Sequence, residues 1–356
     1  MKFSSLQIKN FRAISMLELD NFQQVNLITG RNNCGKTTVL EALFLISGIS
    51  NPRLLMTINN DRGLVIQSND DFNSIFHNLD FEQEPHIAVM LDDYPRTLTV
   101  KPKYTAENNE EIISTEKINL AAENKTMLNA DSFPSVDKII FEFNDGKDMG
   151  NLRSEISLDG NEVAIGIPNL YREKLLCAFY PSRNPMTMLP RQIEKLLINK
   201  LLDGVIETLR EIDPRIAGIG LGSGGAIYVD IGLNKFLPIN IMGDGIRKTL
   251  AIIAAISAVQ GGILLIDEIE NGLHYSSLTI LWKAVLKALE VYNVQLFATT
   301  HSNECIAALD HSHKAAKEKA DNISLYRIEH YNNSHRAFQY SSNVIAAGID
   351  NNIEMR

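Results

Sequence analysis

A short glycine-rich segment has the residue types and spacing needed to hold phosphate groups. It follows an apolar run, Gln24 to Thr29, and precedes a stretch with helical periodicity, Thr37 to Ile46. Glycines let successive backbone N–H groups point at phosphate oxygens, and the start of a helix adds partial positive charge. This strand–turn–helix context and the pattern G-x-x-x-x-G-K-[ST] predict a P-loop. The segment is Gly30-Arg31-Asn32-Asn33-Cys34-Gly35-Lys36-Thr37.

Each part of this loop has an expected role. Lys36 is predicted to reach the β- and γ-phosphates of a nucleotide, and Thr37 to bind Mg²⁺. A thiol beside a helix N-terminus is expected to have a lowered pKa, so alkylation of Cys34 is expected to inactivate the protein. The full set of loop residues predicted to contact the nucleotide is Gly30, Asn32, Asn33, Cys34, Gly35, Lys36, Thr37 and Thr38.

An apolar run that ends in two carboxylates supplies a second motif. Ile263 to Ile266 has the composition of a buried strand and is followed by Asp267 and Glu268. In a Walker B segment, Asp267 would bind Mg²⁺ through water, and Glu268 would orient or deprotonate the attacking water. An acidic pair that caps a helix after a strand would have the same sequence pattern. The P-loop upstream favours the catalytic interpretation.

Two further segments complete a possible site. A strand-like run ends at His301, 33 residues after Glu268, and this histidine is predicted to sense the γ-phosphate. Met242-Gly243-Asp244-Gly245 opens a helix just before the Asp-Glu strand. A helix N-terminus attracts anions, although a plain helix cap would look similar.

These four motifs, in this order, resemble the ATP-binding-cassette (ABC) head of the SMC/RecF/OLD group, and in form the prokaryotic AAA15-type ATPases. Ile8-Lys9-Asn10-Phe11-Arg12 looks like the opening of such heads, and the segment from Ile266 to His274 looks like their Walker B and D-loop. The resemblance covers roughly residues 1–50 and 176–340. It implies ATP and Mg²⁺ as ligands and adds Arg12, Gly243 and Gly245 to the nucleotide contacts.

The resemblance also implies a homo-oligomer, at least a head-to-tail dimer in which each P-loop faces the Gly243–Gly245 turn of the other copy. It suggests work on nucleic acid, or control of a separately encoded effector such as a nuclease, in antiphage defence. OLD proteins carry a Toprim nuclease domain. The chain has no Asp-x-Asp pair, which a Toprim site needs, so no such domain is expected.

One departure from the family pattern motivates an alternative. Transporter and SMC heads have L-S-G-G where this chain has Met242 to Gly245, so their γ-phosphate-contacting serine is absent. Asp244 beside a phosphate is expected to weaken binding unless it points away or pairs with a base such as Arg247. The alternative function is a low-turnover, ATP-gated scaffold or inhibitor that sequesters an effector.

The expected fold class is α/β. It is a P-loop NTPase of ABC-ATPase-head type, with a mainly parallel sheet flanked by helices and an inserted antiparallel β lobe. Residues 1–50 and 176–356 are predicted to form the head, and 51–175 the lobe. Residues 2–9 alternate like an edge strand. Arg191 to Ile212 is predicted to be helical, and two short runs, Ile216–Leu221 and Ala226–Leu233, a hairpin.

Composition limits the remaining possibilities. The 356 residues are 45% hydrophobic and carry a net charge of −9, which excludes wholesale disorder and coating of nucleic acid by bulk charge. Residues 101–150 hold six basic and ten acidic residues, so this stretch is expected to contact protein rather than DNA. The uncharged stretch Thr249 to Ile266 is broken by Gly261-Gly262, and no membrane contact is expected. The chain has no signal-like N-terminus, so a cytoplasmic location is predicted.

Overall fold

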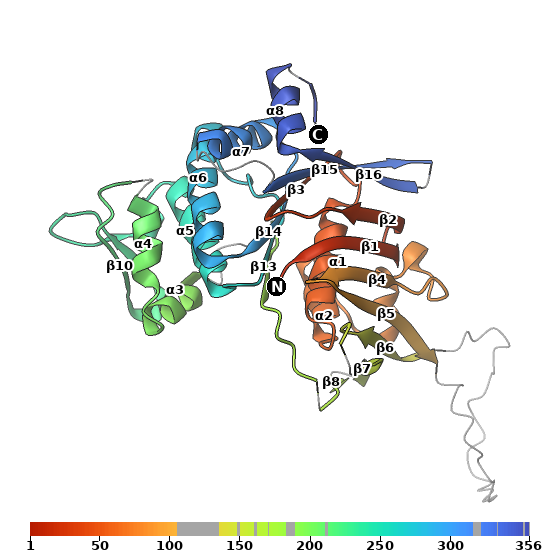
Figure 1. Ribbon diagram of the computed structural model, residues 1–356. Helices are drawn as coiled ribbons and strands as arrows, with labels where there is room; N and C mark the ends of the chain where they lie inside the picture. Colours follow the sequence, from red (N-terminus) through yellow and green to blue (C-terminus); the bar gives the residue numbers. More distant parts are fainter. Residues whose placement is uncertain are drawn as a thin grey trace, which may run out of the picture.

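Two large β-sheets with helices between and beside them form most of the structure (Figure 1). This computed structural model describes residues 1–104, 135–147, 150–159, 162–169, 171–182, 189–210, 213–315, 322–332, 334–351 and 353–355. Most of the stretch 101–150 on which the charge argument rests therefore lies outside the described residues.

The first sheet has seven strands and is antiparallel throughout, in the order β2-β1-β4-β5-β6-β7-β8. The prediction of an edge strand near the N-terminus was wrong, because β1 pairs with both β2 and β4. Alternating burial fits any antiparallel strand with one covered face, so the pattern could not identify its neighbours. The strands are β1 (Phe3–Phe11), β2 (Ile14–Asp20), β4 (His86–Leu91), β5 (Tyr94–Tyr104), β6 (Val136–Asn144), β7 (Leu152–Asp159) and β8 (Glu162–Gly166).

The second sheet has six strands in the order β16-β15-β3-β14-β13-β9. Its pairs are parallel except for β15 with β16. The β3, β13 and β14 strands are buried along their whole length, as expected of parallel strands covered on both faces. The strands are β3 (Val25–Thr29), β9 (Cys177–Tyr180), β13 (Ile263–Ile266), β14 (Gln295–Thr299), β15 (Ile323–Tyr331) and β16 (Ser334–Ser341).

The α/β fold is as predicted, but a mainly parallel sheet is not confirmed. Parallel pairing is limited to the second sheet, and antiparallel pairs outnumber parallel ones among the described strands. The described strands from 51–175 continue the sheet begun by β1 and β2. The division into a head and an inserted lobe stays a prediction.

Successive residues of β13 face two different cores. Ile263 and Leu265 pack on the side of α1 (Lys36–Ser47), whereas Leu264 and Ile266 pack toward α5 and α6. Figure 1 shows α1 between the two sheets and a separate group of helices beyond the second sheet. These outer helices are α5 (Asp244–Ala258), α6 (Tyr275–Tyr292), α7 (Asn303–Ala315) and α8 (Ser342–Asp350). None of the described helices is long and apolar enough to cross a membrane.

A smaller unit lies before α5. The single helix predicted over 191–212 is two helices, α3 (Leu189–Ile198) and α4 (Leu202–Arg210), because the backbone turns at Lys200, where φ is +58°. The predicted hairpin is confirmed as β10 (Gly218–Leu221) and β11 (Ile227–Asp230), with β12 (Leu237–Pro238) added at its edge. Among the described residues, the remaining helical elements are α2 (Arg53–Asp61) and the short 3₁₀ turns η1 (Asn69–Ile75), η2 (His77–Leu79), η4 (Ser223–Gly225) and η5 (Ile239–Ile241).

Candidate nucleotide-binding and catalytic site

The predicted P-loop joins β3 to α1, as the sequence indicated. Gly30 has φ +137°, and a Cβ there would lie 2.3 Å from the carbonyl oxygen of Ile328 and 2.7 Å from the Cys34 sulfur. Gly35, just before α1, has φ +96°. A side chain at Gly30 would therefore both clash and strain the backbone, so the tight loop depends on glycine there.

Lys36 folds back over this loop. Its ammonium donates to the carbonyl oxygens of Gly30, at 2.7 Å, and Arg31, at 3.0 Å. These contacts hold a cation beside the start of α1, where the helix N-terminus also favours an anion. Asn32 and Asn33 are exposed on the outer part of the loop.

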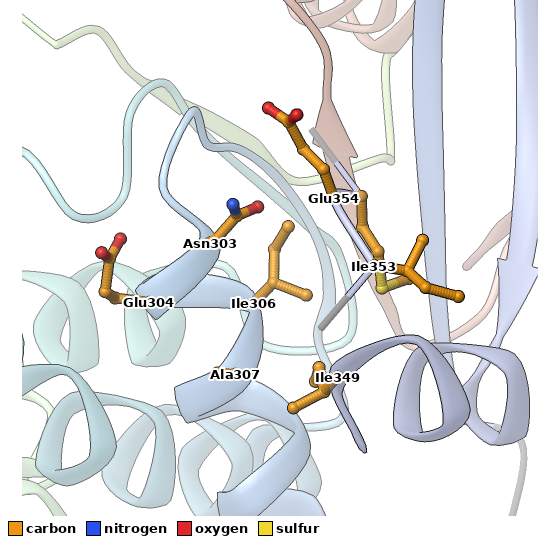
Figure 2. A pocket seen from close by; sticks show the side chains of 8 residues that line it. Asn303, Glu304, Ile306, Ala307, Ile349, Ile353 and Glu354 are labelled. Carbon is orange, nitrogen blue, oxygen red and sulfur yellow. The ribbon is translucent and has the colours of Figure 1, made fainter. Parts of the chain in front are cut away.

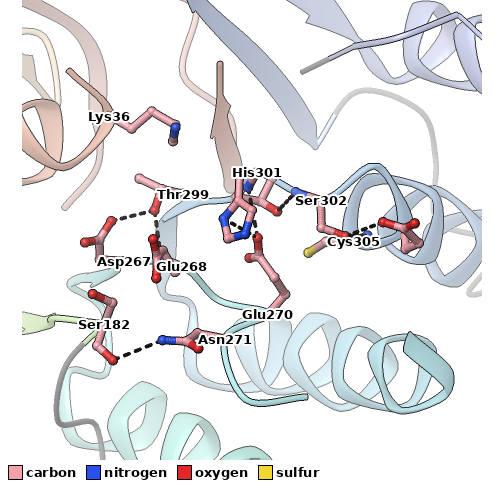
Figure 3. Close-up of polar contacts among 12 residues, drawn as sticks. Lys36, Ser182, Asp267, Glu268, Glu270, Asn271, Thr299, His301, Ser302 and Cys305 are labelled. Carbon is pink, nitrogen blue, oxygen red and sulfur yellow. Dashed lines mark hydrogen bonds and ion pairs between the residues drawn. The ribbon is translucent and has the colours of Figure 1, made fainter. Parts of the chain in front are cut away.

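Three oxygen-bearing side chains meet where β3, β13 and β14 end. The Thr37 hydroxyl donates to the Asp267 carboxylate at 3.1 Å, and the Thr299 hydroxyl donates to it at 2.6 Å. Figure 3 shows Asp267, Glu268 and Thr299 below Lys36. The strands are neighbours in the order β3-β14-β13, which explains how residues 230 positions apart touch.

Glu268 is held by the same threonine. Its backbone N–H donates to the Thr299 hydroxyl at 2.7 Å, and its φ is +51°. A non-glycine residue in this left-handed region is strained, and such strain is concentrated at functional sites. Thr299 was not singled out in the sequence, although its place two residues before His301 at a strand end was a usable signal.

His301 belongs to a pair with Glu270. The His301 backbone N–H donates to Glu270 Oε1 at 2.9 Å, and its Nδ1 lies 3.2 Å from the same oxygen. His301 is 52% exposed on its side chain, whereas Glu270 is buried. Glu270 thus holds the half-exposed imidazole of His301 in place. The sequence patterns did not indicate this role for Glu270.

Arg12 lies in a buried network rather than on the loop itself. Its guanidinium is 2.7 Å from the Glu41 carboxylate and donates to Asn59 at 2.9 Å. Burial lowers the pKa of Arg12 to about 10, against the raising effect of Glu41. Arg62 pairs with the other carboxylate oxygen of Glu41, at 2.6 Å, and donates to the Thr38 hydroxyl at 3.3 Å. Nucleotide contact by Arg12 stays a prediction.

The network reveals two residues that the motifs did not include. Glu41 is almost fully buried on α1, and Arg62 follows α2. Burial lowers the pKa of Arg62, but Glu41 outweighs it and the net pKa is raised. Both guanidiniums share the Glu41 carboxylate, and Asp267 also acts to raise the pKa of Arg62.

The glycine turn before α5 has an exposed, open end. A Cβ at Gly243 would meet nothing within 4 Å, whereas one at Gly245 would lie 3.2 Å from the Ser277 hydroxyl. Arg247 lies 3.4 Å from the Asp244 carboxylate, which is one of the two arrangements that the sequence left open. The negative charge of Asp244 is therefore partly balanced within its own helix.

The environment of Cys34 contradicts the expected reactivity. The side chain is buried, and burial raises the pKa of its thiol, although Lys36 acts in the opposite direction. The partial positive charge of the helix N-terminus is too small to offset the increase in the thiol pKa that burial causes. Cys34 is a small residue that packs against Gly30, with no exposed thiolate to alkylate readily.

The oxygen donors fit Mg²⁺. This ion prefers oxygen ligands and is commonly held by one or two carboxylates together with phosphates and water. Thr37 and Asp267 provide a hydroxyl and a carboxylate side by side. Across the described part of the chain, no group of three or more His, Cys, Asp or Glu residues could hold a metal, so phosphate and water would have to complete the shell.

Hollows lie on both sides of the P-loop. One, of about 430 Å³, lies between Arg31–Cys34 and Arg327–Tyr331, and another, of about 560 Å³, includes Arg12, Thr38 and Arg62. A separate pocket of about 460 Å³ lies between α7 and the C-terminal segment (Figure 2), lined by Asn303, Ile306, Ile349 and Ile353 among others. Neither of the first two pockets is lined by Lys36, Thr37, Asp267 or Glu268, so the pockets by themselves do not mark where a nucleotide binds.

Comparisons with known proteins identify the family of this chain. The family model described as "AAA domain, putative AbiEii toxin, Type IV TA system" matches residues 25–307. A Helicobacter pylori protein named ATP/GTP phosphatase is 28% identical over 335 residues, covering 86% of this chain and 87% of that protein. The DNA replication and repair protein RecF of Shewanella halifaxensis is 38% identical over 90 residues, covering 25% of this chain and 23% of RecF.

A solved structure supports the fold. The SMC head bound to the C-winged helix domain of ScpA aligns with a TM-score of 0.50 and 11% identity, over 96% of this chain and 98% of that one. At this level of identity the likeness concerns the fold alone.

Replacing Lys36 with alanine should weaken ATP binding. The variant loses the cation beside the phosphates, and charge-assisted hydrogen bonds of this kind contribute about 1.5–3 kcal/mol, or about ten- to a hundredfold in affinity. Fluorescent-nucleotide titration measures the change. Lys283→Ala, on the exposed side of α6, is the matched control. Unchanged affinity in Lys36→Ala would remove the P-loop assignment.

Alkylation of Cys34 in the native protein should be at least about tenfold slower than in the unfolded protein at pH 7.5, because the raised pKa keeps the thiol protonated. The rate should rise with pH as the thiol ionises. Mass spectrometry after iodoacetamide treatment distinguishes Cys34 from Cys177 and Cys305, whose thiol pKa values burial raises to about 12. Rapid native labelling of Cys34 would contradict this environment.

Proposed function

This chain belongs to the AAA domain family named above and is an ATPase with an ABC-type head; we propose that two copies pair around ATP and that hydrolysis separates them. The observation that supports this proposal most strongly is that Thr37 and Thr299 both donate hydrogen bonds to Asp267. Glu268 is bound to the same Thr299 hydroxyl, and Lys36 lies on the P-loop beside them. These are the side chains needed to bind phosphate, hold Mg²⁺ and accept a proton from water. The name of the Helicobacter pylori relative supports hydrolysis of a nucleoside triphosphate.

The residues divide the chemistry between them. Lys36 and the backbone N–H groups of Gly30 to Thr37 bind the phosphates. Thr37 and Asp267 would hold Mg²⁺, which when bound neutralises charge on the phosphate oxygens. Glu268 accepts the proton of the attacking water, and His301, oriented by Glu270, donates to the γ-phosphate.

The glycine turn supports the proposed pairing of two copies. Gly243 lies at the exposed N-terminus of α5, with nothing within 4 Å of its missing Cβ. An open helix N-terminus suits a phosphate that arrives from outside the chain. In the proposed dimer that phosphate is the γ-phosphate held by the P-loop of the other copy.

The cellular role that we propose is action on nucleic acid or control of a separately encoded effector, such as a nuclease, in antiphage defence. The RecF relative supports a link to DNA. The balance of six basic and ten acidic residues in 101–150 favours a protein contact for that stretch. A cytoplasmic location is part of this proposal.

A low-turnover scaffold is the second candidate, and Asp244 favours it. Its carboxylate is 72% exposed beside the turn despite the contact with Arg247. Like charge at this place would slow closure on ATP. Steady-state turnover with and without DNA separates the two functions, since a scaffold would bind ATP and hydrolyse it poorly under both conditions.

The Glu268→Gln variant should bind ATP and retain it. The amide keeps the shape but accepts no proton, so turnover should fall by at least about a hundredfold. Light scattering should show a larger ATP-dependent mass than for the wild type. Glu290→Gln, an exposed acid at the end of α6, is the control and should leave both quantities unchanged. Wild-type turnover in Glu268→Gln would exclude Glu268 from the mechanism.

Mixing two inactive variants tests the composite site. Gly243→Asp should bind ATP but not turn over, because its carboxylate repels the γ-phosphate, while aspartate remains a favourable N-cap. Lys36→Ala should fail at its own P-loop. Since half of random pairs are mixed and each has one intact site, the mixture should recover up to about a quarter of wild-type activity.

Gly243 is a cleaner position for this test than Gly245, whose substitution would also disturb Ser277. Gly243→Ser is the control, because it restores the serine of the family pattern without adding charge. Absence of recovered activity, in variants shown to form mixed pairs, would place the γ-phosphate contacts within one chain.

A further inference from the structure

Lys248 connects α5 to the turn that follows β13. Its ammonium donates to the carbonyl oxygen of Asn271 in a short hydrogen bond and makes a longer contact, 3.5 Å, with that of Glu268. Lys248 lies one helical turn after Asp244, the first residue of α5. The sequence motif that opens α5 runs through Lys248, but the sequence indicated no role for it.

The turn that it contacts has an unusual backbone. Glu268 has φ +51° and Gly272 has φ +74°, and the Asn271 N–H donates to the Glu268 carbonyl at 2.9 Å. A left-handed glutamate persists only where its surroundings impose that conformation. Thr299 binds the turn from β14 at the Glu268 N–H, and Lys248 binds it from α5 at the carbonyls.

The charges around Lys248 favour its ammonium form at neutral pH. Burial lowers the pKa of Lys248 to about 8, and the nearby carboxylates of Glu270 and Glu268 act to raise it. A partly buried cation is a costly way to satisfy backbone carbonyls. This cost points to a role beyond local hydrogen bonding.

We propose that Lys248 is a positioning residue that couples the glycine turn of α5 to Glu268. The two ends of one helical turn then have different contacts. Gly243 faces outward, where the γ-phosphate of a second copy would bind, and Lys248 faces inward, onto the backbone of Glu268. A shift of α5 on closure would move the Glu268 backbone through Lys248.

This inference rests on the proposed pairing around ATP. It implies that the Glu268 carboxylate reaches its position for catalysis only after two copies have paired. A purely structural lysine would instead affect folding and nucleotide binding. The two possibilities differ in which kinetic quantity changes, and in whether the loss depends on the presence of Glu268.

The experiment compares Lys248→Met and Lys248→Arg in the full chain. Lys248→Met should lower kcat by at least about tenfold and change KM by no more than about twofold, whereas Lys248→Arg, which keeps the charge, should stay within about threefold of wild type. Fluorescent-nucleotide titration should give wild-type affinity for both. Lys283→Met on α6 is the matched control. Lys248→Gln replaces Lys248→Met if the latter fails to melt cooperatively.

A double variant provides the decisive comparison. If Lys248 acts through Glu268, adding Lys248→Met to Glu268→Gln should lower kcat by less than about twofold further. Multiplied losses, a parallel loss of ATP affinity, or an unchanged kcat in Lys248→Met would overturn the coupling. The mass of Glu268→Gln in the presence of ATP, measured by light scattering, tests the pairing separately. ATP hydrolysis by a wild-type protein that stays a monomer would contradict the dimer on which the coupling rests.

Discussion

The hydroxyl of Thr299 contacts both acidic residues that follow β13: the carboxylate of Asp267 and the backbone of Glu268. It donates to Asp267 and accepts from the backbone N–H of Glu268, so one oxygen fixes two neighbouring residues. Asp267 in turn accepts from Thr37, at the start of α1. The P-loop, the Asp-Glu strand and the strand before His301 are therefore joined at their ends by side-chain hydrogen bonds as well as by the sheet.

The position of α1 depends on a second buried interaction. Glu41 lies on α1 and is shared by Arg12, from the β1–β2 connection, and Arg62, after α2. Breaking a buried ion pair costs about 3–5 kcal/mol because a charge is left without a partner. The helix that begins at the P-loop is thus held to the antiparallel sheet through the connection between β1 and β2.

The outer helices connect this site to the surface. α5 begins at an exposed glycine turn, where Gly245 lies close to Ser277 of α6. The same helix contacts the Glu268 turn through Lys248. Glu270 in the same turn holds His301. An event at the surface of α5 therefore has a short physical route to both Glu268 and His301, without crossing the buried sheet.

The sequence by itself determined the P-loop, the Asp-Glu strand, α1, β3, β14 and the hairpin. Each depends on residues close together in the chain, such as the glycines from Gly30 to Gly35 or the apolar run from Ile263. It did not determine that β1 is an inner strand or that the chain turns at Lys200. It misjudged the thiol of Cys34 and did not indicate Glu41, Arg62, Thr299 or Lys248 as parts of the site. Those features depend on partners distant in sequence, because burial, strand pairing and ion pairs arise only when the folded chain brings separate segments into contact.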